Sequence, residues 1–582
     1  MTDAAEGDQT PLGQVVQSAW LLSQATAEPD EEVAALFEHA AGVILRRGDG
    51  GGAVAALKRA AELSPAAQER VRRAGHAAYL DASLMGELRT AERLLARTVR
   101  TAPGRYQPAE AALADSAILL YSDGDLAAAR RKLAEAMAGF GELPPNAATT
   151  EYVQRVLLLL GHFAGEGPQW ASFRAALAKA DPVTQAHYGP LGAILDDIAH
   201  SPREALGRFD AAIAGLDRLD DSKALRITGI AGYVDRTPAC RRVGRRCALD
   251  AAERGDMANF ILAQSFLSFD ALVSGQWDES LELAESAAEL SGGRGYELFR
   301  YYARIVTAQI HAHRGESAEL QRLTDEMLGW AAPRRARLIT SAALAARARA
   351  ATAVADYEAA FQDCVKICPP GDVAVHSTFV TWMMLDLVEA AVRTGRDAEA
   401  RAHVAALRAS DIAAISSRTA LQVEAATALT EPDDEAIVRF DRCLAAEGIE
   451  QWPFDLARVH LLYGERLRRT KSMAAARVQL DAALEIFRRL GAARWAERAA
   501  KEFRATGQNR QHRTEHAREP LTPQELEIAL LAATGLSNKE IGKRLLLSHR
   551  TVGAHLYRAF PKLGISSRAA LRDALADLEP PE

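Results

Sequence analysis

Turn residues recur at nearly constant intervals along much of this 582-residue chain, and this regularity constrains the fold more than any other feature. Most of the turns are followed by a stretch with the charged and small residues that begin a helix. Helical hairpins of about 35–45 residues that stack side by side form an α-solenoid, in which each hairpin buries its apolar face against its neighbours. The first series of turns lies 38 residues apart and the second 40 residues apart: Gly48, Gly86 and Gly124, then Gly275, Gly315, Ala355 and Gly395.

The composition agrees with an all-α chain. Hydrophobic residues make up 48% of the sequence, alanine is very frequent, and aromatic residues make up only 6%. Alanine and leucine are strong helix formers, whereas strands favour β-branched and aromatic residues. The repeats resemble tetratricopeptide repeats, although their period is longer than the usual 34 residues and the signature is blurred. We therefore predict a tetratricopeptide-like α-solenoid.

A change in composition predicts where this solenoid ends. Residues 505–519 are polar, rich in Gln, Arg and His, and without helical apolar periodicity. We expect a flexible N-terminus at 1–11, a helical-repeat domain at 12–504, a linker at 505–519 and a small helical domain at 520–582. The acidic start of the sequence has no apolar segment of the signal-peptide kind, and no apolar run approaches the ~20 residues of a membrane span.

Charge is unevenly distributed between these domains. The chain has a net charge of −7, but residues 521–572 carry eight Lys and Arg against three acidic residues. This imbalance argues against a protein that coats nucleic acid along its whole length, and it points to the C-terminal end as the basic part. The five cysteines have no regular spacing, which fits a reduced, cytoplasmic protein.

Start signals divide the C-terminal region into four short helices. Thr522 to Glu525 and Ser537 to Glu540 both have the capping-box pattern, Ser548 is a good N-cap for a third helix, and Ser566 and Ser567 precede a fourth. Two short helices joined by a tight turn, the second with a basic polar face, are typical of a helix-turn-helix.

The same region resembles the LuxR-type DNA-binding domain. Its landmarks LT-x-x-E, G-x-SN-x-EI-x-x-x-L, S-x-x-TV-x-x-H and KLG-x-x-SR occur in order from Leu521. Upstream, ALKRAAELSP (56–65) and WPFDLARVHLLYGERLRR (452–469) are similar to repeats of the large ATP-binding regulators of the LuxR family. The chain then corresponds to the C-terminal part of such a regulator without its nucleotide-binding module, because no G-x-x-x-x-G-K-[ST] motif occurs.

This resemblance implies roles for residues of the third and fourth helices. The residues implied to face DNA bases are Gly553, Ala554 and Tyr557. Many family members have lysine at position 553, so glycine there removes a bidentate base contact. The residues expected to contact phosphates are Lys539, Arg550, Thr551, Arg558 and Lys562, and those expected to support dimerisation are Leu571, Leu575 and Leu578.

We predict a bacterial transcription regulator that is not an enzyme and needs no cofactor. Its expected partners are double-stranded DNA, a second copy on DNA, RNA polymerase, and an unknown effector or partner protein at the solenoid. It is expected in the cytoplasm, on the nucleoid when bound, and not at a membrane. Two alternatives remain: an interaction scaffold whose helix-turn-helix no longer reads DNA, supported by Gly553, and the DNA-binding half of an ATP-dependent regulator.

Other patterns favour packing over chemistry. Gly48, Gly50 and Ala53 superficially match a dinucleotide fingerprint but coincide with a repeat turn. Cys364 and Cys368 occupy small-residue positions of a repeat, and the Cys240 and Cys247 pair lacks a second pair of metal ligands. Four tryptophans are also interpreted as fillers between repeats: Trp277, Trp382, Trp452 and Trp495.

Overall fold

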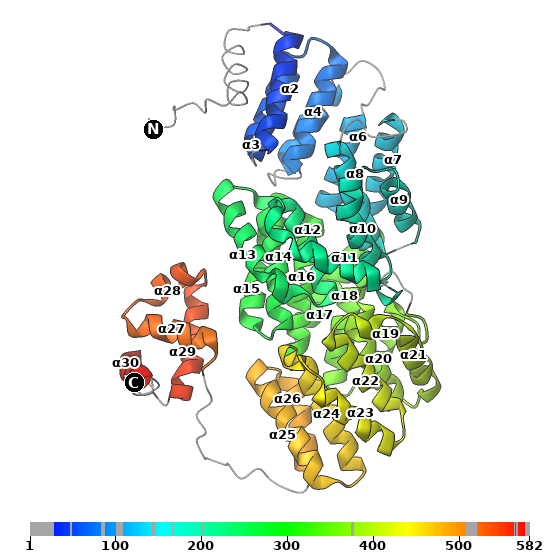
Figure 1. Cartoon of the computed structure of the whole chain (residues 1–582), viewed down its shortest axis with the longest axis vertical. Helices are drawn as coiled ribbons and strands as arrows, with labels where there is room; N and C mark the ends of the chain where they lie inside the picture. Colours follow the sequence, from blue (N-terminus) through cyan, green and yellow to red (C-terminus); the bar gives the residue numbers. More distant parts are fainter. Residues whose placement is uncertain are drawn as a thin grey trace. The chain divides into compact units, whose positions relative to one another are not determined.

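The computed structural model describes residues 28–46, 49–82, 88–100, 109–140, 147–165, 167–200, 203–373, 378–506, 521–563, 565 and 568–576. This described part is helical and contains no strand. The chain divides into two compact units, one formed by the helices before Gly507 and the other by the helices after it. Figure 1 follows both units from the N-terminal helices in blue to the C-terminal helices in red. The predicted all-α architecture is confirmed.

The first half of the first unit consists of helices that follow one another along the chain. They are α2 (Glu31–Arg46), α3 (Gly50–Leu63), α4 (Ala67–Leu80), α5 (Leu88–Arg100), α6 (Ala109–Ile118), the π-helical turn η2 (Leu119–Asp123), α7 (Leu126–Phe140), α8 (Ala147–Ala164), α9 (Gly167–Leu177), α10 (Pro182–Asp196), η3 (Ile198–His200), α11 (Arg203–Ala214), η4 (Leu216–Arg218), α12 (Asp221–Ala231) and η5 (Gly232–Val234).

The second half of the unit is more regular. Its helices are α13 (Thr237–Arg254), α14 (Met257–Val273), α15 (Trp277–Arg294), α16 (Glu297–Arg314), α17 (Ser317–Arg334), α18 (Arg337–Ala353), α19 (Tyr357–Ile367), α20 (Val380–Arg393), α21 (Asp397–Ala409), η6 (Ile412–Ala414), α22 (Ser417–Thr430), α23 (Asp433–Ala445), η7 (Ile449–Gln451), α24 (Pro453–Arg469), α25 (Met473–Leu490) and α26 (Ala493–Arg504).

These helices form the two layers of an α-solenoid. From α14 to α26, each even-numbered helix contacts the next even-numbered helix. The helices α17, α19, α21, α23 and α25 each contact the helix before and the helix after them. Helix α26 also contacts α16 and α18, so the last repeat packs back against the middle of the same unit.

From Gly255 to Ala355 the turns recur every 20 residues rather than every 40. Left-handed backbone ends successive helices at Gly255, Gly275, Gly295 and Gly315, with φ of 68, 80, 83 and 81°. The same conformation occurs at Arg335 (φ 55°), Ala355 (φ 64°) and Gly395 (φ 77°). Residues other than glycine rarely adopt this region, so Arg335 hides one turn of the 20-residue period from a search for glycine. In the 38-residue series Gly124 is left-handed (φ 66°), whereas Gly48 and Gly86 lie outside the described residues.

A buried ionic network joins four of the inner helices. Asp386 and Glu389 on α20 and Glu465 on α24 are at most 4% exposed. Arg458 on α24 binds both Asp386 (2.6 Å) and Glu389 (2.8 Å). Arg498 on α26 binds Glu389 (2.5 Å) and Glu465 (2.8 Å). Arg349 on α18 is a further partner of Asp386, with its Nη2 3.1 Å from the carboxylate.

The residues interpreted as packing groups are buried in the solenoid. All five cysteines are buried and reduced, and Cys364 and Cys368 are fully covered. Cys364 lies on α19, and Cys368 is the residue that caps the end of that helix. The four tryptophans named above are at most 4% exposed. No group of three or more metal-ligating side chains occurs in the part of the chain that the structure describes.

The second unit consists of short helices around a single apolar core. They are α27 (Pro523–Ala533), α28 (Asn538–Leu545), α29 (His549–Leu563), the 3-10 turn η8 (Arg568–Ala570) and α30 (Leu571–Ala576). The core contains Ile528 and Ala529 of α27, Ile541 of α28, and Val552 and Leu556 of α29. The described part of the fourth helix reaches Ala576, and Leu578 lies outside the described residues. No described helix is long and apolar enough to cross a membrane.

Candidate nucleic-acid interface

Both predicted capping boxes are present and fix the starts of α27 and α28. Glu525 donates its backbone N–H to Thr522 Oγ1 (3.2 Å), and Glu525 Oε2 accepts from the Thr522 N–H (3.0 Å). The Ser537 and Glu540 pair makes the same reciprocal bonds, at 3.3 and 2.7 Å. Each box satisfies two backbone donors that a helix start leaves without an intrahelical partner. Local sequence therefore determines where both helices begin.

The turn between α28 and α29 depends on Gly542. Helix α28 ends at Leu546 in a left-handed conformation (φ 58°), and the Leu547 N–H donates to Gly542 O at 2.8 Å. A Cβ atom on residue 542 would lie only 2.4 Å from Leu547 O. Only glycine leaves room for this close return of the backbone, which sets the angle between the two helices. No pattern in the sequence had predicted this role of Gly542.

Two landmarks of the sequence pattern hold the fourth helix in place. Arg568 Nη1 donates to Asn538 Oδ1 at 2.6 Å, and its Nη2 donates to the carbonyl oxygen of Leu536. These bonds tie η8 to the turn between α27 and α28, 30 residues earlier in the chain. Asn538 and Arg568 therefore have a structural role in this domain, which the sequence analysis did not assign.

Lys562 lies in an ion pair inside the domain. Its Nζ is 2.8 Å from Glu525 Oε2, and the two side chains are only 16% and 5% exposed. Burial raises the pKa of Glu525, but the hydrogen bond and charge of Lys562, together with the hydrogen bonds to Thr522, outweigh that effect and leave the pKa below its ordinary value. The pair joins α27 to α29. The expectation that Lys562 is a free phosphate contact is therefore corrected, because its charge is already compensated.

Thr551 also differs from its expected role. Its side chain is 2% exposed, and its hydroxyl lies 2.9 Å from the hydroxyl of Ser548. The Thr551 N–H donates to Ser548 Oγ at 3.1 Å. These contacts make Thr551 part of the N-terminal cap of α29. Because the domain covers its side chain, Thr551 is not available on the surface as a phosphate contact.

Other predicted interface residues lie on the surface of α28 and α29. Tyr557 is 79% exposed, and Gly553 and Ala554 are partly exposed one turn earlier on α29. A Cβ atom on residue 553 would make an ordinary 3.4 Å contact with Asn538 Nδ2, so glycine is not sterically required there. Three of the predicted phosphate contacts are exposed: Lys539, Arg550 and Arg558. Two further cations of α28, Lys543 and Arg544, are also exposed and were not predicted as contacts.

The leucines assigned to dimerisation pack inside the domain. Leu571 is 0% and Leu575 is 8% exposed, and both belong to the core with Ile528 and Val552. Because these side chains are already buried, the expectation that they face a partner is corrected. Arg572, between them on α30, is exposed.

The fold and this surface define the class of the C-terminal domain. A short helix, a glycine-dependent turn and a second helix with exposed polar and basic residues form a helix-turn-helix. The profile of the luxR family of bacterial regulatory proteins matches residues 519–574. The C-terminal domain belongs to this family, as its sequence landmarks predicted.

Relatives match this chain over the same region. The chain is 40% identical over 88 residues to Mb0914c of Mycobacterium bovis, which is named as a putative HTH-type transcriptional regulator. The matched segment is 14% of this chain and 10% of that protein. It is 46% identical over 50 residues to the transcriptional regulatory protein LiaR of Bacillus subtilis, 9% of this chain and 24% of that protein. The chain thus spans a tenth to a quarter of the length of these relatives.

Solved structures match the chain as a whole only loosely. One of human IFIT1 covers 86% of this chain and 95% of its own, with 13% identity and a TM-score of 0.25. The yeast Tom70 structure covers 81% of this chain and 96% of its own, with 10% identity and a TM-score of 0.21.

Two glycine-to-alanine variants test the turn. Gly542→Ala forces a methyl group against Leu547 O and should destabilise the helix-turn-helix by about 1–3 kcal/mol. Gly553→Ala introduces a better helix former whose methyl group makes only an ordinary contact with Asn538, and it should stabilise the domain by about 1 kcal/mol. Hydrogen exchange of peptides from 537–563 in the full chain measures both. Equal protection in the two variants would show that the turn tolerates a side chain at 542.

Proposed function

We propose that this protein is a transcription regulator that binds double-stranded DNA by placing α29 in the major groove. The observation that carries the proposal is the outer surface of α29: within a luxR-family helix-turn-helix, Gly553, Ala554 and Tyr557 are accessible there. The exposed cations Arg550 and Arg558 lie on the same helix. Helix α29 has 15 residues and is about 22 Å long at 1.5 Å per residue. Only its first turns reach base edges in such a docking.

The base-facing residues support limited direct reading. Ala554 offers a methyl group to the methyl group of thymine, and the Tyr557 hydroxyl can make one hydrogen bond with a base edge. Gly553 offers no side chain. We therefore propose that affinity rests mainly on phosphate contacts by Lys539, Arg550 and Arg558, with the amides at the start of α29 adding a weak anion site. Thr551 and Lys562 position α29 from within the domain.

Pairing of two chains on DNA is part of the proposal. A small domain with few base contacts binds weakly alone, and a second linked domain raises the affinity through effective concentration. We propose that dimerisation uses the outer side of α30, marked by Arg572. The solenoid, which is the larger unit, is proposed to sense a small ligand or partner protein and to control access of the dimer to DNA and RNA polymerase in the cytoplasm. No catalytic role is proposed.

A scaffold that no longer reads DNA is the second candidate, and Gly553 favours it. That glycine is not needed for packing, so its presence reflects a missing base contact rather than a steric constraint. Recovery of DNA with the tagged protein, followed by sequencing, separates the two candidates. A shared sequence motif among the recovered fragments supports the regulator, and random fragments or none support the scaffold.

Salt dependence tests the phosphate contacts. With three cations in contact, the slope of log K against log salt concentration should be about −3 for one domain. Arg550→Ala and Lys539→Ala should each make the slope shallower by about 1 and weaken specific and random DNA alike. Arg208→Ala, which removes an exposed arginine of the solenoid, is the matched control and should change neither. A change of sequence preference in Arg550→Ala, with random binding intact, would instead place Arg550 on a base.

A further inference from the structure

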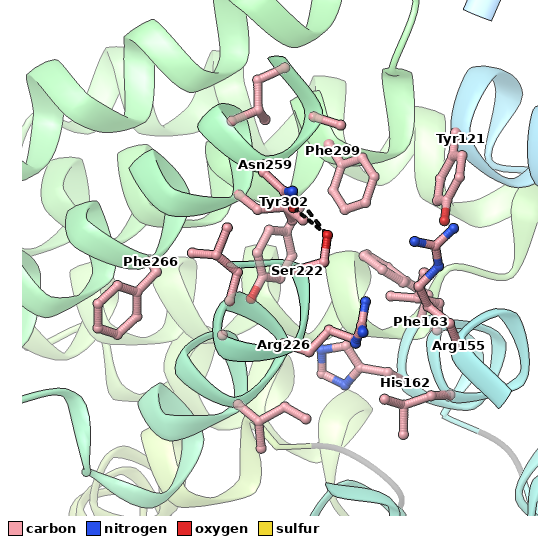
Figure 2. A pocket seen from close by; sticks show the side chains of 18 of the residues that line it. Tyr121, Arg155, His162, Phe163, Ser222, Arg226, Asn259, Phe266, Phe299 and Tyr302 are labelled. Carbon is pink, nitrogen blue, oxygen red and sulfur yellow. Dashed lines mark hydrogen bonds between the residues drawn. The ribbon is translucent and has the colours of Figure 1, made fainter. Parts of the chain in front are cut away.

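A cavity of about 130 Å³ lies inside the solenoid, between η2, α8, α12, α14 and α16. Its wall is mainly aromatic and aliphatic. Figure 2 shows Tyr121, Phe163, Phe299 and Tyr302 around the same space as Arg155 and Arg226. An apolar cavity of comparable size, about 150 Å³, is known to accommodate benzene. The space therefore suits a ligand with one aromatic ring.

Arg155 on α8 brings a positive charge to this wall without a carboxylate among the described residues. Its guanidinium group lies 5.2 and 5.9 Å from the ring centroids of Tyr152 and Tyr79. Within the described part of the chain, its one hydrogen bond runs from Nη2 to the Tyr79 hydroxyl (3.3 Å), and its buried Nε has no partner there. Arginine is rarely buried unless it is paired with an acidic group.

Arg226 on α12 adds a second guanidinium group to the same wall. It binds Glu151 at 2.7 Å, and that carboxylate also accepts Lys223 at 3.3 Å. The Nε of Arg226 is buried and, within the described residues, has no hydrogen-bond partner. The Glu151 carboxylate is therefore shared by two cations. Lys223 also pairs with Asp220, at 3.1 Å. With Arg155, this leaves an excess of positive charge at the cavity.

His162 supplies a neutral polar group beside the arginines. Burial lowers the pKa of His162 to about 3, so its imidazole is uncharged at neutral pH. Its Nε2 lies 3.1 Å from the Tyr233 hydroxyl, which lies 3.2 Å from the Tyr302 hydroxyl. These groups offer hydrogen bonds but no charge. Among the described residues that line the cavity, the charged groups are the two guanidinium groups.

We propose that this cavity binds a one-ring aromatic carboxylate, with the carboxylate on Arg155 and Arg226 and the ring among Phe163, Phe299 and Tyr302. A guanidinium group matches a carboxylate with two parallel N–H bonds, and a planar ring stacks on aromatic walls. The inference deepens the proposed role of the solenoid as a ligand sensor and rests on it for its regulatory meaning, but not for binding itself.

Gly229 on α12 allows the cavity to be filled without loss of packing. It lines the cavity, and a Cβ atom added there has no other atom within 4 Å. Gly229→Leu should therefore occupy the ligand space while improving helix propensity. Gly207→Leu on α11 is the matched control, since that glycine is exposed, is outside the cavity and has equally open surroundings.

Calorimetric titration of the full chain with benzoate, 4-hydroxybenzoate and phenylacetate tests the proposal, with benzamide as the neutral analogue of benzoate. We expect at least one carboxylate to bind and, for the benzoate pair, the amide to bind about tenfold more weakly or worse, the equivalent of 1.4 kcal/mol. Gly229→Leu and Arg155→Met should each lose at least about tenfold in affinity for the carboxylate that binds, and Gly207→Leu should match the wild type. Circular dichroism confirms that each variant is folded.

Several outcomes would overturn the inference. These are the absence of binding by all three carboxylates at millimolar concentration, equal binding of benzoate and benzamide, or undiminished binding by folded Gly229→Leu. Preference for phenyl phosphate over benzoate would reject the carboxylate. DNA binding is measured on the same samples. Carboxylate binding without any effect on DNA affinity would keep the site and reject the sensor role, whereas failure of DNA binding alone would leave the site intact.

Discussion

Glu389→Ala should lower the stability of the solenoid by about 3–5 kcal/mol, the range for removing one partner of a buried ion pair. Glu389 is fully buried and holds Arg458 at 2.8 Å and Arg498 at 2.5 Å. Burial raises the pKa of Glu389, but Arg498 and Arg458 lower it below its ordinary value and keep the group ionised. The alanine variant leaves both arginines with an uncompensated buried charge. Their other partners, Asp386 and Glu465, are already shared.

Tryptophan fluorescence during urea unfolding measures this effect. The Arg458 guanidinium group lies 4.8 Å from the ring centroid of Trp495, so the indole reports directly on the network. Hydrogen exchange of peptides from α20, α24 and α26 shows whether the loss is local, which matters because a long repeat array need not unfold in two states.

Glu358→Ala is the matched control for this prediction. Glu358 belongs to α19, next to α20, and its pair with Arg396 (2.8 Å) lies at the surface. Exposed pairs are screened by water and salt and contribute little. We therefore expect the control to unfold at nearly the wild-type urea concentration. If both variants shift the midpoint equally, the buried network does not hold the repeats together.

The repeat architecture was predictable because its signal is local. A turn residue followed by a helix start can be recognised from sequence alone, and the 40-residue series was correct at every position. The 20-residue period was missed because Arg335 takes the left-handed conformation that usually indicates glycine. A backbone hydrogen bond from the Ala336 N–H to Ala331 O (3.1 Å) closes this turn, and the type of residue 335 does not reveal it.

The buried ionic network was not predictable in the same way. Glu389 and Arg498 are 109 residues apart, and each by itself looks like a residue on a solvated helix face. They meet because α26 packs back against the inner helices of the same unit. Such contacts depend on the curvature of the whole array, which no single repeat encodes.

The same distinction applies to the DNA-binding domain. The capping boxes were predicted correctly because their partners lie three residues apart. The partner of Lys562, Glu525, lies 37 residues away, so the local sequence does not show the pair. Lys562 was therefore wrongly taken for a side chain that is available to DNA. Periodicity placed Leu571 and Leu575 on one face of a helix, but it could not show that this face closes the domain core.

Leu571→Glu should unfold the helix-turn-helix domain and abolish its DNA binding. Leu571 is fully buried among apolar side chains of α27 and α29, and a carboxylate there has no partner among the described residues of the core. Burying an unpaired charge costs several kcal/mol. A domain of fewer than about 70 residues rarely has more than about 3–5 kcal/mol of stability from its core. We expect hydrogen exchange to lose protection throughout α27–α29.

The tryptophans separate this effect from damage to the rest of the chain. All seven precede Gly507, so the fluorescence transition of the solenoid should stay at its wild-type urea concentration while DNA binding is lost. Arg572→Ala changes the adjacent, exposed position on α30 and should keep full protection. If α30 supports pairing on DNA, this variant binds single half-sites nearly normally and loses cooperative binding to paired half-sites. Unchanged cooperativity would remove Arg572 from the dimer contact, and a folded Leu571→Glu domain would contradict the assignment of α30 to the core.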